Sequence, residues 1–352
     1  MRHDLPSLIK SAAADVGFDL AGIAPVGHFP ELTRFPEWIA DGHAGEMKYL
    51  ESRDDSGQLR RASLHSIFPW ARSVVVCAIN YNTTHPYSTQ VIEPTRGWIS
   101  RYAWSREDYH DSVLRRLREL ESKLKELFAP DPIETRSYVD TGPIVERVYA
   151  KYAGIGWLAK NTCLINQGIG SWLFLGVIIT SLELTPDLPA PDRCGTCTRC
   201  IDACPTHAFV APHQLDSNKC IAYLTIEKRG SIPEDLREGI GHQVFGCDIC
   251  QDVCPWNRKA PATANPEFQP REGFVNPALA WLAEISEEDF RETFRGSPVK
   301  RAKRNGLRRN ALIAIGNSGD SSLLPLVESA TSDPEPSIAE AARWAVKRLT
   351  NR

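Results

Sequence analysis

The chain has 352 residues, of which 42% are hydrophobic and 24% charged, and its formal net charge is −3. This length predicts two or three domains with ordinary packed cores. The charge balance excludes a chain that is polybasic throughout, so any contact with nucleic acid must come from a local basic patch. The first residues contain no apolar signal core, and the longest apolar run, residues 172–180, is too short to span a bilayer. We therefore expect a soluble, cytoplasmic protein with no membrane partner.

Helix and strand patterns alternate over the first half of the chain. The spacing of apolar residues predicts helices at residues 5–17, 105–128 and 143–153, and strands at residues 20–26, 73–79, 136–140 and 172–181. Ser105 is the expected N-cap of the long helix. The β-branched run at 73–79 is continuous, as in a strand that is buried on both faces. The alternation predicts an α/β domain over residues 1–185.

Two loose segments divide the rest of the chain. Prolines at 186, 189 and 191 mark the start of a cysteine-rich segment, residues 186–260, and the proline-containing stretch KAPATANPEFQPREG follows it. Residues 261–352 are predicted to be helical. Short amphipathic helices at 308–315, 321–330 and 337–349 are separated by GNSGD and SDPEP, a spacing that resembles HEAT-type helical hairpins.

Eight of the ten cysteines lie between Cys194 and Cys254, which indicates a metal framework rather than dispersed disulfides. Cys77 and Cys163 sit beside apolar residues and are expected to have no chemical role. The first motif, CGTCTRCIDACP, has the complete CxxCxxCxxxCP spacing. The second, CDICQDVCP, ends in the same Cys-Pro pair but has only two cysteines before it.

The cysteine spacing predicts two [4Fe–4S] clusters in a ferredoxin-like domain. A CxxCxxC loop binds three corners of one cube, and the cysteine of the following Cys-Pro pair reaches the other cluster. Cys220 is the expected replacement for the ligand that the second motif lacks. The alternative is two structural zinc sites, because zinc also binds CxxC pairs, although zinc does not require the full run. The predicted ligands are Cys194, Cys197, Cys200 and Cys254 for cluster one, and Cys204, Cys220, Cys247 and Cys250 for cluster two.

The remaining motifs do not name the acceptor of the electrons. Residues 153–156 contain glycines, but no GxGxxG motif follows a predicted strand as a dinucleotide site requires. The sequence DGHAG at 41–45 is one residue shorter than the DxHxxG loop that gives cobalamin a histidine ligand, and it reads as a polar turn. A further cofactor is still expected, because clusters alone rarely carry out two-electron bond cleavage.

Several segments together resemble the epoxyqueuosine reductase family in order and spacing, and the similarity extends over almost the whole chain. They are VDTGPIVERVYAKYAGIGWLAKNT, GSWLFLGVIIT, the first cysteine motif, LDSNKCIAYLTIE and FGCDICQDVCPWNR. The resemblance implies cobalamin, bound without a protein histidine as axial ligand, beside two [4Fe–4S] clusters. It also implies the reaction: the epoxide of epoxyqueuosine at the tRNA wobble position is reduced to the alkene of queuosine.

The resemblance assigns the proton donor of this reaction to Asp140, in the sequence YVDTGP at a predicted strand-to-helix junction. The alternative for Asp140 is a helix cap. Because a donor near neutral pH needs a raised pKa, we predict an apolar, desolvated Asp140. Glu146 and Arg147 follow on the predicted helix, where an ion pair and a role in the site are both open.

The resemblance also places the loop at 160–162 against the corrin ring. Its candidate cofactor-binding residues are Lys160, Asn161 and Thr162, and ordinary solvation is the alternative. The loop departs from the family pattern, because Ala159 stands where glycine is common and Asn161 where histidine is frequent. Further candidates are Ser171 and Ser217, for which turn formation is the alternative.

The segment RGSPVKRAKRNGLRR, residues 295–309, contains seven basic residues and no acidic one. A charge run is often a solvated helix face, but the absence of neighbouring carboxylates favours contact with tRNA phosphates. The expected contacts are Lys300, Arg301, Lys303, Arg304, Arg308 and Arg309. Specificity would come from an extruded base.

The alternative function is a non-catalytic electron-transfer module of the ferredoxin type, which would need neither a corrinoid nor a basic patch. The predicted partners of the enzyme are tRNA carrying epoxyqueuosine and an electron donor that the sequence does not identify. With no coiled coil or pairing strand apparent, we expect a monomer.

Overall fold

A computed structural model describes residues 5–90 and 93–351 of the chain. The chain forms two compact units, each assembled from three separate segments. Unit 1 comprises Met1–Asn82, Tyr109–Thr198 and Pro255–Thr263, and unit 2 comprises Thr83–Asp108, Arg199–Cys254 and Ala264–Arg352. The division of the chain at residues 185 and 260 stays a prediction.

Unit 1 is built on a sheet with strand order β1-β2-β7-β4. Every neighbouring pair is antiparallel, so the alternation of helices and strands has not produced parallel βαβ units. Val76 on β2 pairs with Val177 on β7. All of β2 is buried, as the continuous apolar run predicts. The strands are β1 (Leu20–Pro25), β2 (Ser73–Asn80), β4 (Thr135–Tyr138) and β7 (Leu173–Thr180), which confirms the four predicted strands.

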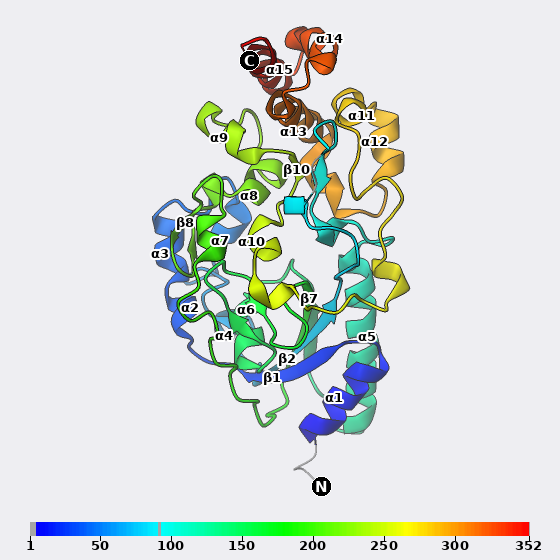
Figure 1. Cartoon of the computed structure of the whole chain (residues 1–352). Helices are drawn as coiled ribbons and strands as arrows, with labels where there is room; N and C mark the ends of the chain where they lie inside the picture. Colours follow the sequence, from blue (N-terminus) through cyan, green and yellow to red (C-terminus); the bar gives the residue numbers. More distant parts are fainter. Residues whose placement is uncertain (1–4, 91–92, 352) are drawn as a thin grey trace. The chain divides into compact units, whose positions relative to one another are not determined.

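Helices cover both faces of this sheet. Helices α1 (Leu5–Asp15) and α5 (Tyr109–Phe128) contact one face, whereas α6 (Glu146–Tyr152) contacts β1, β2 and β7 from the other (Figure 1). The predicted start of the long helix at Ser105 is wrong, because Ser105 forms a β-bridge with Pro270 in unit 2. The shorter elements of unit 1 are α2 (Pro30–Thr33), α3 (Phe35–Ala40), α4 (Leu64–Ile67), β5 (Trp157–Leu158) and β6 (Leu164–Ile165).

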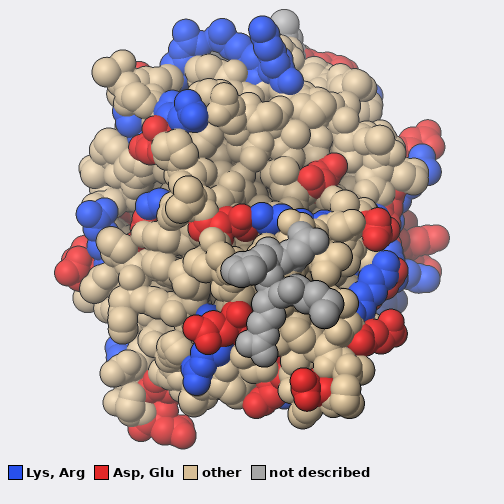
Figure 2. Space-filling model, turned by 90° about the horizontal axis from the view of Figure 1, so that it is seen from below, with Lys and Arg blue, Asp and Glu red and all other residues tan. Residues whose placement is uncertain are grey.

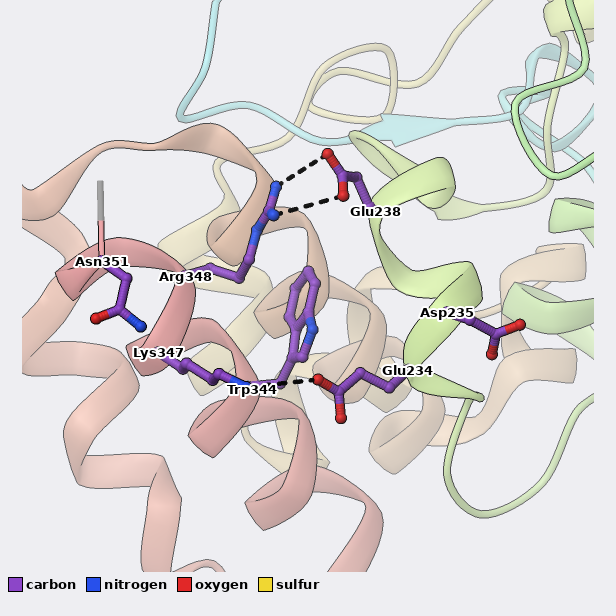
Figure 3. Close-up of a pocket in the computed structure, with 7 residues that line it drawn as sticks. All are labelled: Glu234, Asp235, Glu238, Trp344, Lys347, Arg348 and Asn351. Atoms are coloured by element: carbon purple, nitrogen blue, oxygen red, sulfur yellow. Dashed lines mark hydrogen bonds and ion pairs between the residues drawn. The ribbon is translucent and has the colours of Figure 1, made fainter.

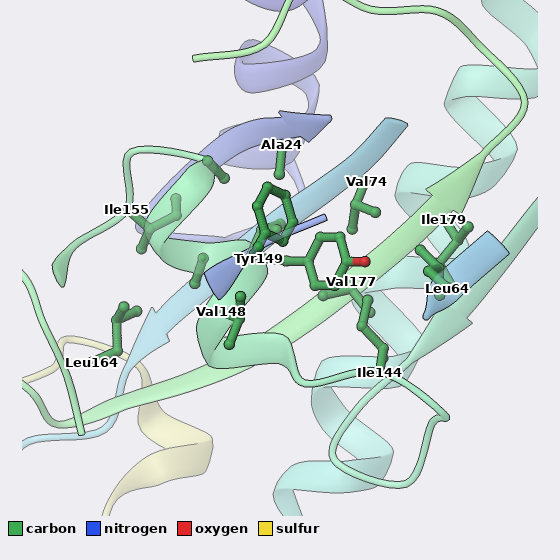
Figure 4. Packing of buried hydrophobic residues seen from close by; sticks show 14 of the residues in the cluster. Ala24, Leu64, Val74, Ile144, Val148, Tyr149, Ile155, Leu164, Val177 and Ile179 are labelled. Carbon is green, nitrogen blue, oxygen red and sulfur yellow. The ribbon is translucent and has the colours of Figure 1, made fainter. Parts of the chain in front are cut away.

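The core between α6 and the sheet is apolar and closely packed. Tyr149 of α6 projects among Val74, Val177 and Ile179 (Figure 4), and all four side chains are almost completely buried. Burying a side chain of this size contributes about 1.5–3 kcal/mol. This packing fixes α6, and with it the loop that leads from β4 into α6.

Unit 2 has a helical part centred on α13 (Lys303–Ser318), which contacts α8, α9, α11, α15 and β10. The helices predicted at 308–315, 321–330 and 337–349 correspond to α13, α14 (Leu324–Ser329) and α15 (Pro336–Thr350). Their assignment as HEAT-like repeats stays a prediction. No helix in the described ranges is long and apolar enough to cross a membrane.

The other elements of unit 2 are short, and β3 pairs in parallel with β10. They are β3 (Trp98–Ile99), α7 (Arg199–Asp202), β8 (Phe209–Ala211), β9 (Gln214–Leu215), α8 (Ile221–Ile226), α9 (Glu234–Ile240), β10 (Gln243–Phe245), α10 (Ile249–Asp252), α11 (Leu279–Glu284) and α12 (Glu287–Thr293).

Candidate functional site

Asp140 lies in the tight loop between β4 and α6 of unit 1. Its backbone φ is 58°, a left-handed conformation that few residues other than glycine adopt but that aspartate tolerates. Gly142 makes the turn possible, because a Cβ there would lie 2.5 Å from the Tyr138 ring. The loop leaves the Asp140 side chain 68% exposed, so its carboxylate is available at the end of the strand.

Two aromatic side chains at the start of α5 hold this carboxylate. The Tyr109 hydroxyl donates a hydrogen bond to Asp140 Oδ2 at 3.2 Å, and His110 Nε2 lies 3.6 Å from the same oxygen. The Tyr109 ring stacks on Phe174 of β7, with 4.4 Å between the centroids. Sequence reasoning missed Tyr109 and His110, which it placed within the long helix; the adjacent Tyr-His pair near an N-terminus was the available signal.

The prediction of an apolar, desolvated Asp140 is wrong for this arrangement. The neighbouring His110, whose Nε2 lies 3.6 Å from Oδ2, holds the pKa of Asp140 below its usual range, and partial burial only opposes this effect. The positive charge of His110, the Tyr109 hydroxyl and the charge of Arg147 lower the pKa further. Asp140 is therefore an ionised carboxylate in the described structure.

Glu146, the first residue of α6, has a raised pKa, in contrast to the lowered pKa of Asp140. Burial raises its pKa to about 7, and the negative charge of Asp140 raises it further, while Arg61 and Arg147 oppose the shift. Its Oε1 atom is buried and has no hydrogen-bond partner in the described part of the chain. The ion pair that the sequence left open for Glu146 is not formed.

The loop that was predicted to face a corrin lies beside α6 in unit 1. Arg147 Nη1 donates to the Thr162 carbonyl at 2.7 Å, and Thr162 has a left-handed φ of 64°. Asn161 is buried and accepts a hydrogen bond from the Cys163 backbone N–H at 3.2 Å. Lys160 instead turns to the first cysteine motif, where its Nζ donates to the carbonyls of Gly195 and Cys197 at 2.6 and 3.0 Å.

The two candidate serines are buried in separate units. Ser171 Oγ accepts a hydrogen bond from Asn257 Nδ2 at 2.8 Å within unit 1. Ser217 lies in a 3-10 turn of unit 2, where its carbonyl accepts from the Cys220 N–H at 3.0 Å. Both contacts fit the structural alternative, in which these serines stabilise a turn or a contact between two chain segments.

All ten cysteines lie in the described part of the chain, and all of them have free thiols. In unit 2, burial raises the pKa of Cys247 well above its ordinary value, and the nearby thiols of Cys220 and Cys204 add to the shift. Three of the four ligands predicted for cluster two are thus close together without being joined. Such a group favours ionisation only when a bound cation or cluster compensates its charge, so it fits an iron–sulfur cluster.

N–H groups point toward ligand sulfurs in both units. The Ala208 N–H donates to Cys204 Sγ at 3.4 Å. Burial raises the pKa of Cys194, whereas the Lys160 backbone N–H lowers it. Hydrogen bonds to the sulfurs are one of the means by which proteins tune iron–sulfur clusters. Within the described residues, no three His, Cys, Asp or Glu side chains converge on a position for a single metal ion.

A buried carboxylate anchors the second cysteine motif. Asp248, next to Cys247, accepts hydrogen bonds from Trp98 Nε1 at 2.9 Å, from Ser100 Oγ at 2.5 Å and from the Arg101 backbone N–H at 2.7 Å. This network ties α10 to β3 inside unit 2. Local sequence patterns do not predict this network, because its partners are about 150 residues apart.

The basic segment is only partly available to a ligand. Arg309 is 2% exposed and donates hydrogen bonds to backbone carbonyls of Leu224, Lys228 and Gly230. Arg308 pairs with Asp333 at 2.8 Å. The expected phosphate contact of Arg309 is therefore wrong, since its guanidinium is used inside the protein.

Carboxylates and carbonyls also engage other members of this segment, contrary to the expectation of unpaired charge. Arg301 forms a two-bond contact with Glu227, both bonds being 2.9 Å, and Arg304 Nε donates to the Ile285 carbonyl at 2.7 Å. Lys300 and Lys303 remain exposed. Most of the face drawn in Figure 2 carries neither charge, and its acidic and basic side chains lie in small groups.

A pocket of about 460 Å³ opens between α9 and α15 of unit 2. Its charged side chains pair across it: Lys347 with Glu234 at 4.0 Å, and Arg348 with Glu238 at 3.3 Å (Figure 3). The guanidinium of Arg348 also lies 5.7 Å from the centre of the Trp344 ring. These contacts hold the two helices together and leave no group poised for catalysis.

Comparison with known proteins gives consistent matches. Residues 61–141 match the family model "Epoxyqueuosine reductase QueG, DUF1730", and residues 193–257 match the "4Fe-4S double cluster binding domain". The chain is 37% identical to an epoxyqueuosine reductase of Xanthomonas campestris pv. campestris over 97% of this chain and 96% of that protein. It is 45% identical to one of Synechocystis sp. over 82% and 98% of the two chains.

Solved structures agree with these matches. An epoxyqueuosine reductase crystallised with an epoxyqueuosine-modified tRNA-Tyr stem loop superposes with a TM-score of 0.88 at 33% identity, over 99% of this chain and 91% of that one. The Bacillus subtilis enzyme superposes with a TM-score of 0.87 at 32% identity, over the same shares of the two chains. That structure is described as having the loop of its catalytic aspartate swung out of the active site.

Proposed function

Because the chain belongs to the epoxyqueuosine reductase family and is therefore an oxidoreductase, we propose that it reduces the epoxide of epoxyqueuosine in tRNA to the alkene of queuosine. We further propose that Asp140 gives a proton to the departing oxygen. Two electrons and two protons enter, and one water molecule leaves. The observation that carries the proposal is the exposed Asp140 carboxylate on a strained loop.

The ionised state of Asp140 is compatible with this role. Tyr109 and His110 hold the Asp140 carboxylate at the exposed surface of the loop between β4 and α6, where bound substrate can replace water. Exclusion of water and loss of the His110 contact both raise a carboxyl pKa, so Asp140 takes up a proton as the base binds. A catalytic aspartate loop that swings, as in the Bacillus subtilis relative, supports a movement of this kind.

The cysteines would hold two [4Fe–4S] clusters, which supply single electrons when bound. Proximity within unit 2 supports one ligand set, Cys204, Cys220, Cys247 and Cys250. Motif spacing supports the other set, Cys194, Cys197, Cys200 and Cys254. Lys160 would stabilise the Cys194 thiolate through its backbone N–H group.

Cobalamin would supply a cobalt centre that is a strong nucleophile and one-electron donor. The neutral amide of Asn161 and the hydroxyl of Thr162 suit the amide side chains at the edge of a corrin, and Arg147 holds this loop through the Thr162 carbonyl. Lys160 and Ser171 are engaged elsewhere in unit 1, so their part is to position the loop and its surroundings.

Lys300 and Lys303 would contact the tRNA backbone, with a smaller contribution from Arg301 because of its pairing with Glu227. Contacts of this kind strengthen binding without selecting a sequence. The relative crystallised with a modified stem loop supports tRNA as the substrate.

Replacing Asp140 tests the role of its carboxyl group. We expect Asp140→Asn to lower kcat by about 10²–10⁴-fold, the usual contribution of a general acid, with little change in the KM for tRNA. Asp131→Asn, an exposed aspartate of the same unit, is the matched control. Single-turnover assays on epoxyqueuosine-containing tRNA provide the measurement, and wild-type rates in Asp140→Asn would refute the assignment.

A further inference from the structure

Glu146 carries a carboxyl group that the proposed reaction has not used. It begins α6, and its Oε1 atom is buried without a hydrogen-bond partner among the described residues. One turn further along the helix, the Tyr149 hydroxyl is likewise buried without a partner, surrounded by the apolar core (Figure 4). A buried carboxylate without a partner is costly, and a buried carboxylic acid much less so.

The charged groups that act on Glu146 come from three segments. Asp140 lies on the loop before α6, Arg147 is the next residue of the helix, and Arg61 comes from the segment after α3. Both guanidinium groups are engaged with backbone carbonyls: Arg61 with Ile144 at 3.2 Å and Arg147 with Thr162 at 2.7 Å. Among the described residues, neither arginine forms an ion pair with Glu146, although both positive charges oppose the rise of its pKa.

The environments of Asp140 and Glu146 thus shift the pKa values of these two carboxyl groups in opposite directions. His110, 3.6 Å from Asp140 Oδ2, and the hydrogen bond from Tyr109 favour the ionised form of Asp140, whereas burial and the negative charge of Asp140 favour the neutral form of Glu146. A pair of this kind assigns an acid and a base. Of the two carboxyl groups, Glu146 is the one that keeps its proton to the higher pH.

We propose that Glu146 is the proton reservoir of the site and reloads Asp140 between the two proton transfers of the reaction. This inference rests on the proposed function and names a further residue for it. The reduction needs two protons, and a single carboxyl group at Asp140 delivers only one before it must be recharged.

The proposed reaction consumes two protons and two electrons. The Asp140 carboxylic acid gives a proton to the epoxide oxygen as the first C–O bond breaks, which leaves a hydroxyl on the ring and a carboxylate at Asp140. Glu146 then transfers its proton to the Asp140 carboxylate. Asp140 gives this second proton to the hydroxyl, which departs as water as the second C–O bond breaks and the alkene forms. One electron from the enzyme's reductant enters as the first C–O bond breaks, which leaves a carbon radical beside the hydroxyl, and the second enters as the other C–O bond breaks. Solvent returns the protons.

The test compares Glu146→Gln and Glu146→Asp with the wild-type holoenzyme over a range of pH. Protonated Glu146 is the competent form, so the wild-type kcat should fall as the pH rises through about 7. In Glu146→Gln we expect kcat to drop by about 10²-fold, with this descending limb lost and the KM for tRNA unchanged. Glu146→Asp should restore part of the rate and the limb.

Infrared spectra of the same proteins give a readout that does not depend on turnover. The wild type should show a protonated carboxyl band below neutral pH that disappears as the pH rises through about 7, and Glu146→Gln should lack this band. Glu31→Gln is the control for damage to α6, because Glu31 bonds Lys151 and Tyr152 of that helix. It should keep the wild-type pH profile.

The outcomes distinguish this inference from the proposed function. Loss of activity in Asp140→Asn together with a wild-type pH profile in Glu146→Gln would overturn the role of Glu146 and leave Asp140 as donor. Loss of the descending limb in His110→Gln but not in Glu146→Gln would also overturn it, since the reservoir would then be His110. Normal activity in Asp140→Asn would refute the proposed function itself.

Discussion

At the scale of single residues, burial decides what each basic side chain of the segment 295–309 does. Arg309 and Lys303 are six residues apart in the same helix. The buried guanidinium of Arg309 donates to three backbone carbonyls, whereas the side chain of Lys303 is exposed. The sequence pattern does not distinguish Arg309 from Lys303, because the contacts that bury Arg309 come from residues about 80 positions away.

This difference predicts opposite effects for two alanine substitutions. Arg309→Ala removes the guanidinium from the buried Leu224 carbonyl and the buried Asn310 Oδ1, so it should lower the free energy of unfolding by about 3 kcal/mol or more. Lys303→Ala should change it by less than about 0.5 kcal/mol. Urea unfolding of the two variants measures both quantities. A stable Arg309→Ala protein would contradict the buried role assigned to this residue.

Binding experiments complete the comparison. Lys303→Ala should weaken tRNA binding and lower the slope of log affinity against log salt by about 1, as expected when one phosphate contact is lost. An unchanged salt slope would remove Lys303 from the tRNA surface.

At the scale of elements, the strands of unit 1 could be predicted from the sequence, but the helix boundaries near the site could not. The continuous apolar run of β2 gives a strong local signal. Helix α5 begins at Tyr109 because the preceding residues contact unit 2 segments, and a bridge from Ser105 to Pro270 leaves no local pattern. That shift places Tyr109 and His110 at the helix start, where they reach Asp140.

The cysteine motifs were the most predictable part of the site, because the spacing of ligands is itself the chemical requirement. What the spacing cannot show is how the motif is supported. Asp248 fixes α10 through buried hydrogen bonds to Trp98 and Ser100, which lie far away along the chain. The orphaned oxygen of Glu146 is likewise a property of packing and not of sequence.

The assignment of Cys247 to a cluster predicts a specific loss of iron. The wild-type chain should contain about eight irons after anaerobic reconstitution, as two cubane clusters require, and Cys247→Ser about four. Cys163→Ser, which alters a cysteine outside the motifs, should keep the full amount. Iron and sulfide analysis with EPR of the reduced protein makes the measurement. Equal iron in both variants would exclude Cys247 as a ligand.

At the scale of the whole molecule, each unit gathers segments from distant parts of the chain. Residues 255–263 join unit 1 through contacts such as Asn80 Nδ2 to the Pro261 carbonyl at 2.9 Å. Domain boundaries placed at proline-rich stretches assume that each domain is continuous in sequence. They cannot predict that a distant segment packs back into unit 1, because contacts between distant segments do not affect local composition. The family could be predicted from the sequence because the resemblance compares the entire order of motifs.

The most direct test of the proposed function is whether the protein removes the epoxide oxygen of epoxyqueuosine in tRNA. The protein is reconstituted with iron, sulfide and cobalamin without oxygen, supplied with a one-electron reductant, and given tRNA that carries epoxyqueuosine. Nucleoside mass spectrometry should show conversion of epoxyqueuosine to queuosine by wild type and Asp131→Asn, and almost none by Asp140→Asn. Unchanged epoxyqueuosine with a fully loaded wild-type protein would contradict the proposed function.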